Sequence, residues 1–233
     1  MFGEVFSMQK SGKDISPFTA ILIVLTTFLL SLFLGAAILM LFEFSFIVYS
    51  FLMVFGELFL VVIPLGYMLY KKVIVSDYIG LKVEPKIILL GIAFGVFLLF
   101  FNLVISNILF SIFGVSEAVE ESNKLLVEIS STPSGLVPVV LSLSLAGLCE
   151  EFTFRGFLQT TINSKYSSGV ALLVSSLIFG LFHFDPQGVY MISAFLMGLV
   201  LGYIYLRWRS YVISAVAHST LNLIVLAILL LVG

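Results

Sequence analysis

The chain has 233 residues, of which 61% are hydrophobic and 10% charged, with a mean hydropathy of +1.23 and a formal net charge of -2. This composition excludes an ordinary water-soluble domain and indicates a polytopic membrane protein. A net charge this close to zero provides no basic field for a nucleic-acid partner. The sequence therefore predicts an integral, multi-pass membrane protein whose first partner is the lipid bilayer.

Apolar runs long enough to cross a bilayer recur along the whole chain. A membrane core needs about 20 apolar residues in helical form, whereas barrel strands would be alternating segments of about 10 residues. The fold class predicted is all-α, with seven transmembrane helices, or eight if an interfacial or re-entrant helix is added. The predicted spans are 18–42, 46–70, 87–113, 136–161, 168–184, 188–206 and 211–232.

The loop 114–135 is acidic, and its residues 115–130 have the pattern of a short amphipathic helix. We place it as the boundary between residues 1–135, which hold the N-terminal helices and the acidic outer loop, and residues 136–233, which hold nearly all the polar groups within spans. Both segments are expected to form one compact membrane domain.

Basic residues predict the orientation of the chain in the membrane. With the N-terminus in the cytoplasm, ten of the eleven Lys and Arg residues lie on the inner side, and only Lys124 lies outside. Cytoplasmic loops carry an excess of such residues. We therefore expect a cytoplasmic N-terminus and, with seven spans, a C-terminus outside.

The fourth predicted span carries three charged residues, Glu150, Glu151 and Arg155. Each charge near the middle of a bilayer costs about 2.5–3.5 kcal/mol, and such groups normally face the protein interior and mark function. Glu151 and Arg155 are four residues apart, which predicts a salt bridge on one helix face. Glu150 points about 100° away from Glu151 around the helix axis, so it is free to act as a general base. A buried, ion-paired cluster that only stabilises helix packing would have the same sequence pattern.

Both histidines of the chain lie in predicted spans. Asp185-Pro186 follows His183 and predicts a short fifth helix, because residues before proline avoid the helical region. His218 and Asn222 are four apart and share a helix face. A carboxylate with an imidazole can deprotonate water, and an imidazole with a carboxamide can donate to an oxyanion. The pattern therefore predicts a hydrolase in which Glu150 and His183 activate water while His218 and Asn222 stabilise the oxyanion.

Two other residues within spans were weighed for a role. Glu57, in the second predicted span, either forms a hydrogen bond with a neighbouring helix or lines a cavity. Cys149 precedes Glu150, but it points in a different helical direction and is expected to be a small packing residue.

The motifs Glu150-Glu151-x-x-x-Arg155, Phe179-x-x-x-His183 and His218-x-x-x-Asn222, in this order, resemble the CAAX-protease and bacteriocin-processing family. That family is also called the abortive-infection or Ras-converting endopeptidase family, and the resemblance covers about residues 136–227. It implies a glutamate-type intramembrane endopeptidase with a conical cavity. In eukaryotic members the substrate is a prenylated protein, cleaved after its modified cysteine.

The resemblance implies roles for seven residues of this sequence. The expected catalytic residues are Glu150, His183, His218 and Asn222, and the expected supporting residues are Glu151, Arg155 and Phe179. The expected partner is a protein or peptide substrate, either prenylated at a CAAX sequence or otherwise membrane-associated. No cofactor is expected.

Two alternatives stay open at this point. Two histidines and a glutamate can form a zinc site, so a zinc-dependent protease with Glu150, His183 and His218 as ligands is the first. The second is a membrane scaffold or a bacteriocin-immunity protein without proteolytic activity. The distance between Glu150 and His183 is the critical one, because straight helices would place these two residues at different depths.

Overall fold

The computed structural model describes residues 14–43 and 45–232, and all regular secondary structure within these ranges is helical. Lys10 and Lys13, which entered the orientation prediction, lie outside the described residues. In chain order the elements are α1 (Pro17–Leu41), α2 (Phe46–Tyr70), α3 (Val75–Ile79), α4 (Pro85–Phe113), α5 (Glu117–Ser130), α6 (Pro133–Glu151), the π-helix η1 (Phe152–Gln159), α7 (Thr160–Asn163), α8 (Ser168–Phe182), α9 (Val189–Trp208) and α10 (Tyr211–Val232).

Six helical segments of the described chain are long and apolar enough to cross a membrane. They are α1, α2, α4, α9, α10 and the continuous segment Pro133–Asn163, which confirms six of the seven predicted spans. The prediction of a full crossing at 168–184 needs correction, because α8 has 15 residues. At 1.5 Å per residue it is about 22 Å long, less than the roughly 30 Å of a membrane core. The predicted amphipathic helix at 115–130 is confirmed as α5.

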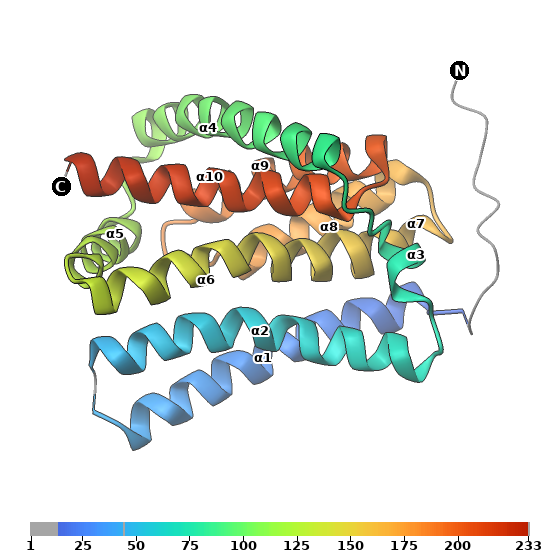
Figure 1. The fold of residues 1–233 in the computed structure, drawn as a ribbon, viewed down its shortest axis with the longest axis horizontal. Coiled ribbons are helices and arrows are strands. Elements are labelled where there is room, and N and C mark those ends of the chain that lie inside the picture. Colours follow the sequence, from blue (N-terminus) through green and yellow to red (C-terminus); the bar gives the residue numbers. More distant parts are fainter. Residues whose placement is uncertain (1–13, 44, 233) are drawn as a thin grey trace.

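Basic side chains gather at one end of the helix bundle. Figure 1 places the start of α1, the end of α2, α3, the start of α4, α7 and the α9–α10 turn at the same end, on the right, and α5 at the other. The basic residues of these right-hand segments are Lys71, Lys72, Lys82, Lys86, Lys165, Arg207 and Arg209, whereas Lys124 is on α5. The described basic residues are therefore concentrated at one end of the bundle, as the predicted orientation in the membrane requires. Arg155 is the exception, since it is buried and does not lie at a helix end as expected.

The π-helix η1 begins directly after Glu151, within the segment that the sequence predicts as one regular helix. The Thr160 hydroxyl donates to the Arg155 carbonyl at 3.1 Å, and the Thr153 hydroxyl donates to the Leu60 carbonyl of α2 at 3.0 Å. All eight residues of η1 are buried, because α1, α2, α3, α8, α9 and α10 all contact it. Short π-helical segments are frequent at functional sites.

Two glycines bring α10 close to its neighbours. A Cβ on Gly95 of α4 would lie 2.8 Å from the Ala217 carbonyl oxygen of α10, and a Cβ on Gly147 of α6 would overlap with Ser219 of α10. Small residues allow this close backbone approach between membrane helices. The position of His218 along α10 is therefore fixed from both sides, by α4 and by α6.

We predict that Gly147→Ala lowers the stability of the protein by about 1–3 kcal/mol, because the added methyl group would push α10 away from α6. Thermal unfolding in detergent measures this effect. The matched control is Gly66→Ala in α2, where no heavy atom lies within 4 Å of the added Cβ. We expect this control to be neutral or slightly stabilising, and equal losses in the two variants would contradict the prediction.

Candidate active site

The predicted salt bridge is present and fully buried. Arg155 Nη1 lies 2.8 Å from Glu151 Oε1, and the two side chains are 1% and 0% exposed. The other terminal nitrogen of Arg155 donates to the Gly198 carbonyl of α9 at 3.2 Å, and the guanidinium carbon lies 4.4 Å from the centroid of the Phe179 ring. Phe179 of α8 thus lies against the buried guanidinium of Arg155, which is consistent with the supporting role predicted for it.

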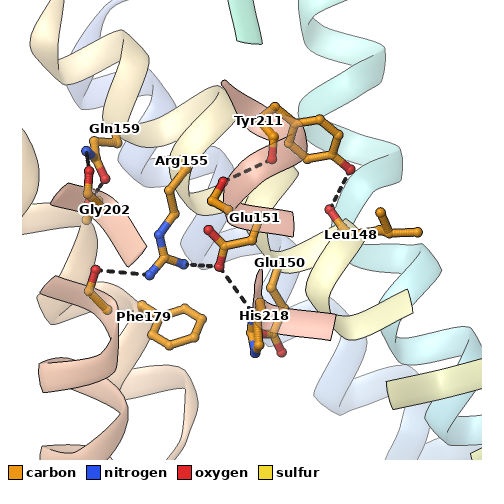
Figure 2. A network of polar contacts seen from close by, with 12 residues as sticks. Leu148, Glu150, Glu151, Arg155, Gln159, Phe179, Gly202, Tyr211 and His218 are labelled. Atoms are coloured by element: carbon orange, nitrogen blue, oxygen red, sulfur yellow. Dashed lines mark hydrogen bonds and ion pairs between the residues drawn. The ribbon is translucent and has the colours of Figure 1, made fainter. Parts of the chain in front are cut away.

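His218 of α10 lies between the two glutamates. Its Nδ1 is 3.1 Å from Glu151 Oε1, and its Nε2 is 3.9 Å from Glu150 Oε2. Figure 2 shows the Glu151 carboxylate between Arg155 on one side and His218 on the other. Glu151 therefore neutralises Arg155 and also orients the imidazole. The contact between Glu151 and His218 depends on how α10 packs against α6, and the spacing of residues in the sequence does not predict it.

His183 follows α8 and is oriented by the backbone. Its Nδ1 lies 2.8 Å from the Phe179 carbonyl, and because a carbonyl only accepts, Nδ1 carries the hydrogen. In the neutral ring Nε2 is then the acceptor. The Phe179 ring centroid lies 4.5 Å from that of His183 and 6.0 Å from that of His218, so both imidazoles flank one aromatic ring.

The relation between His183 and Glu150 stays a prediction. Within residues 14–43 and 45–232, no hydrogen bond or ion pair joins the two side chains directly. The early end of α8 and the contact of Phe179 with both imidazoles bring His183 toward the level of His218. Asp185 has a role that the sequence did not indicate: it accepts hydrogen bonds from the backbone N–H groups of Tyr190 and Met191, at 2.9 and 3.1 Å, and so caps α9.

Asn222 lies one helical turn beyond His218 on α10. Its amide nitrogen donates to the Leu143 carbonyl of α6 at 3.3 Å. A carboxamide has two N–H hydrogens, so this contact leaves the second one for another acceptor. The position is compatible with the predicted oxyanion role, which remains a prediction.

Glu57 of α2 is a neighbour of Glu150 of α6, on two helices that pack against each other. Glu57 Oε2 and Glu150 Oε2 are each buried without a hydrogen-bond partner among the described residues. Of the two roles considered for Glu57, this arrangement favours the residue that lines the site. A contact between α2 and α6 is long-range, which is why the sequence left both roles open.

Gln159 is a polar residue of the same region that the motif spacings missed. Its amide nitrogen donates to the Gly202 carbonyl of α9 at 2.9 Å, and its oxygen accepts from the Ser175 hydroxyl at 3.0 Å. Arg155 bonds Gly198 in the same way one turn earlier. The spacing Gly198-x-x-x-Gly202 is the available sequence signal, because it marks a helix face that other elements approach closely.

The three residues named as alternative zinc ligands do not fit a metal site in this arrangement. Among the described residues, no group of three His, Cys, Asp or Glu side chains is placed to hold a metal ion. His218 and His183 each have Nδ1 on an acceptor, which leaves both Nε2 atoms available. The misfit is therefore in the positions of the three side chains and not in the tautomers of the imidazoles.

A cavity of about 550 Å³ lies at the basic end of the bundle, away from these residues. It is lined by α3, the start of α4 and the α9–α10 turn, and its walls include Asp77, Lys86 and Arg209. None of the predicted site residues lines it. It is therefore not the conical cavity expected around Glu150, which remains a prediction.

We predict that Arg155→Met lowers the free energy of unfolding by about 3–5 kcal/mol, because it leaves the Glu151 charge buried without its main partner. Adding Glu151→Met should recover part of this loss, since an apolar pair removes both charges. Thermal unfolding in detergent measures both variants. Lys124→Met is the surface control; Lys124 pairs with Glu120 at 3.1 Å with both side chains mostly exposed, and its loss should stay within about 1 kcal/mol. Equal effects of Arg155→Met and Lys124→Met would contradict the prediction.

Comparisons with known proteins support the resemblance found in the motifs. Residues 132–224 match the family model described as "Type II CAAX prenyl endopeptidase Rce1-like". The "Putative membrane peptidase YdiL" of Bacillus subtilis (strain 168) is 27% identical over 147 residues, which are 63% of this chain and 56% of that protein. The "UPF0177 protein YxdF" of Lactococcus lactis subsp. lactis (strain IL1403) is 28% identical over 93 residues, 38% of this chain and 50% of that protein. The match thus spans about half the length of each relative. No solved structure is significantly similar to the chain.

Proposed function

We propose that the chain is an intramembrane endopeptidase, because residues 132–224 match the model of the Rce1-like type II CAAX prenyl endopeptidase family. Its substrate would be a membrane-associated protein, cleaved near its C-terminus, with a prenylated CAAX sequence as the leading candidate. The observation that carries the proposal is the arrangement around His218, which lies 3.1 Å from Glu151 and 3.9 Å from Glu150. Two acids and an imidazole inside apolar helices are costly for packing alone.

The hydrogen bonds of the two imidazoles support different roles for them. His183 has its Nδ1 hydrogen on the Phe179 carbonyl, so its Nε2 is able to accept a hydrogen bond from water. His218 has Nδ1 on the Glu151 carboxylate, so its Nε2 donates a hydrogen bond when the ring is an imidazolium.

In the proposed reaction, water is activated by Glu150 and His183. The water oxygen attacks the scissile carbonyl carbon, its proton passes to Glu150, and its second hydrogen points to His183 Nε2. The oxyanion that forms accepts hydrogen bonds from His218 Nε2–H and the Asn222 amide. When the C–N bond breaks, Glu150 returns the proton to the leaving amine. Glu151, Arg155 and Phe179 hold these groups in place.

The proposal includes the orientation of the enzyme. The basic end of the bundle would face the cytoplasm, following the positive-inside rule. α8, with 15 residues, would carry His183 into the membrane. In Figure 1 the α9–α10 turn lies at the basic end and α10 ends at the opposite end, so that the C-terminal end of α10 would lie outside. This is the orientation expected from the sequence. A tag accessibility assay on each side of the membrane tests it.

We predict that Glu150→Gln lowers kcat by at least about 100-fold, because glutamine cannot accept the proton of the attacking water. The assay is cleavage of a prenylated CAAX peptide by purified protein in lipid vesicles, followed by mass spectrometry of the products. Thermal unfolding of the same preparation should show that the variant still folds. The control is Glu120→Gln on α5, which should cleave as the wild type does.

Four outcomes of this assay have distinct meanings. Cleavage of the prenylated peptide alone supports the CAAX substrate class. Cleavage of both prenylated and unprenylated peptides supports an endopeptidase without a need for the lipid group. Full activity of Glu150→Gln would contradict the proposed mechanism, and a wild type without activity toward any membrane peptide would favour a scaffold or immunity protein.

A further inference from the structure

The N-terminal helices bring a third carboxyl group to the site. Thr153 of η1 donates to the Leu60 carbonyl of α2, which fixes the register between these two elements. Glu150 and Glu57 each lie three residues before one of these partners, and α2 and α6 run in the same direction (Figure 1). The two acids therefore lie at the same level of the bundle, on neighbouring helices. These two helices pack directly against each other.

Glu57 Oε2 and Glu150 Oε2 are each buried without a hydrogen-bond partner among the described residues. His218 Nε2 lies 3.9 Å from Glu150 Oε2, which is beyond hydrogen-bond distance. A buried carboxyl oxygen without a hydrogen bond is costly, and most buried polar atoms have a partner. If Glu57 holds a proton, one hydrogen bond from Glu57 to Glu150 satisfies both groups. If both acids are ionised, neither can donate to the other and the two charges repel each other.

The charges of the whole cluster favour a proton on Glu57. Glu150 and Glu151 already outnumber Arg155, so that an ionised Glu57 would add a further negative charge within apolar helices. Cys149 and Tyr190, which also lie near the two acids, cannot become cations. His183, whose ring lies 5.3 Å from that of Tyr190, is neutral in its proposed role as an acceptor. The neutral form of Glu57 is the one that adds no further charge to the cluster.

We infer that Glu57 is a positioning residue of the site, whose protonated carboxyl group donates a hydrogen bond to Glu150. This bond would hold the Glu150 carboxylate so that its other oxygen takes the proton of the attacking water. The inference rests on the proposed function for its catalytic consequence, but the protonated state and the hydrogen bond are properties of the resting protein. Glu57 lies outside the segment 132–224 that matches the family, so the comparison assigns it no role.

The activity test compares Glu57→Leu with Glu57→Gln. Leucine removes the donor, and the loss of a hydrogen bond to a charged group predicts a fall in kcat of about 10- to 100-fold with KM within about twofold. Glutamine keeps an N–H donor and should restore kcat to within about threefold of the wild type. The control is Asn107→Leu in α4, whose amide donates only to the Leu103 carbonyl one turn earlier and which should cleave as the wild type does. A wild-type kcat in Glu57→Leu, or an equal loss in Glu57→Gln and Glu57→Leu, would overturn the inference.

Infrared difference spectroscopy tests the protonated state without any substrate. In the wild-type minus Glu57→Gln spectrum of the full chain in lipid at neutral pH, we expect the carbonyl band of a protonated carboxylic acid. This band should shift in Glu150→Gln, because its hydrogen-bond acceptor changes, and stay in place in Asn107→Leu. A carboxylate band in its place would overturn the inference. Because this readout needs no cleavage, an inactive wild type would count against the proposed function, while the spectra would still decide the state of Glu57.

Discussion

A buried arginine remains compatible with an apolar helix bundle only while other groups balance its charge and bind its N–H groups. Glu151 supplies the charge for Arg155 at 2.8 Å, the Gly198 carbonyl accepts one hydrogen bond, and Phe179 covers the guanidinium face at 4.4 Å. Arg155 lies in η1, and its partners come from the end of α6, from α8 and from α9. The ion pair thus requires four elements to meet at one point, and the positions of the site residues follow from that requirement.

The close contacts around this ion pair determine which helices can carry the chemistry. Gly147 admits α10 against α6, and this contact places His218 within 3.1 Å of Glu151. On the other side, Phe154 packs edge-on against Phe179 and Phe182 with ring centroids at 5.1 and 4.9 Å, which holds α8 against η1. Small residues therefore determine the position of His218 on α10, and aromatic packing determines the position of His183, which follows α8.

Local features of the sequence predicted the helices and the pairs formed within one helix. Apolar run length gave six of the seven spans, and the spacing of Glu151 and Arg155 gave the salt bridge. The fifth span was overestimated, because α8 ends at Phe182, directly before His183, and its 15 residues are too few for a full crossing. The π-helix, the contact of His218 with Glu151 and the approach of Glu57 to Glu150 depend on packing between distant segments. Periodicity and spacing contain no information on such contacts.

The segment 132–224 that matches the family contains the predicted catalytic residues but not everything that surrounds them. α2 lies against α6 and supplies both the Leu60 carbonyl for Thr153 and the carboxyl group of Glu57. α1 supplies Phe28, whose ring stacks on Phe182 with centroids 4.0 Å apart. Since a carboxylate in an apolar setting responds to every charge and donor near it, the helices before residue 132 help to determine the properties of Glu150. Relatives that share the matched segment and differ in their first helices are therefore expected to differ in how Glu150 is held and protonated, even where the motif residues are the same.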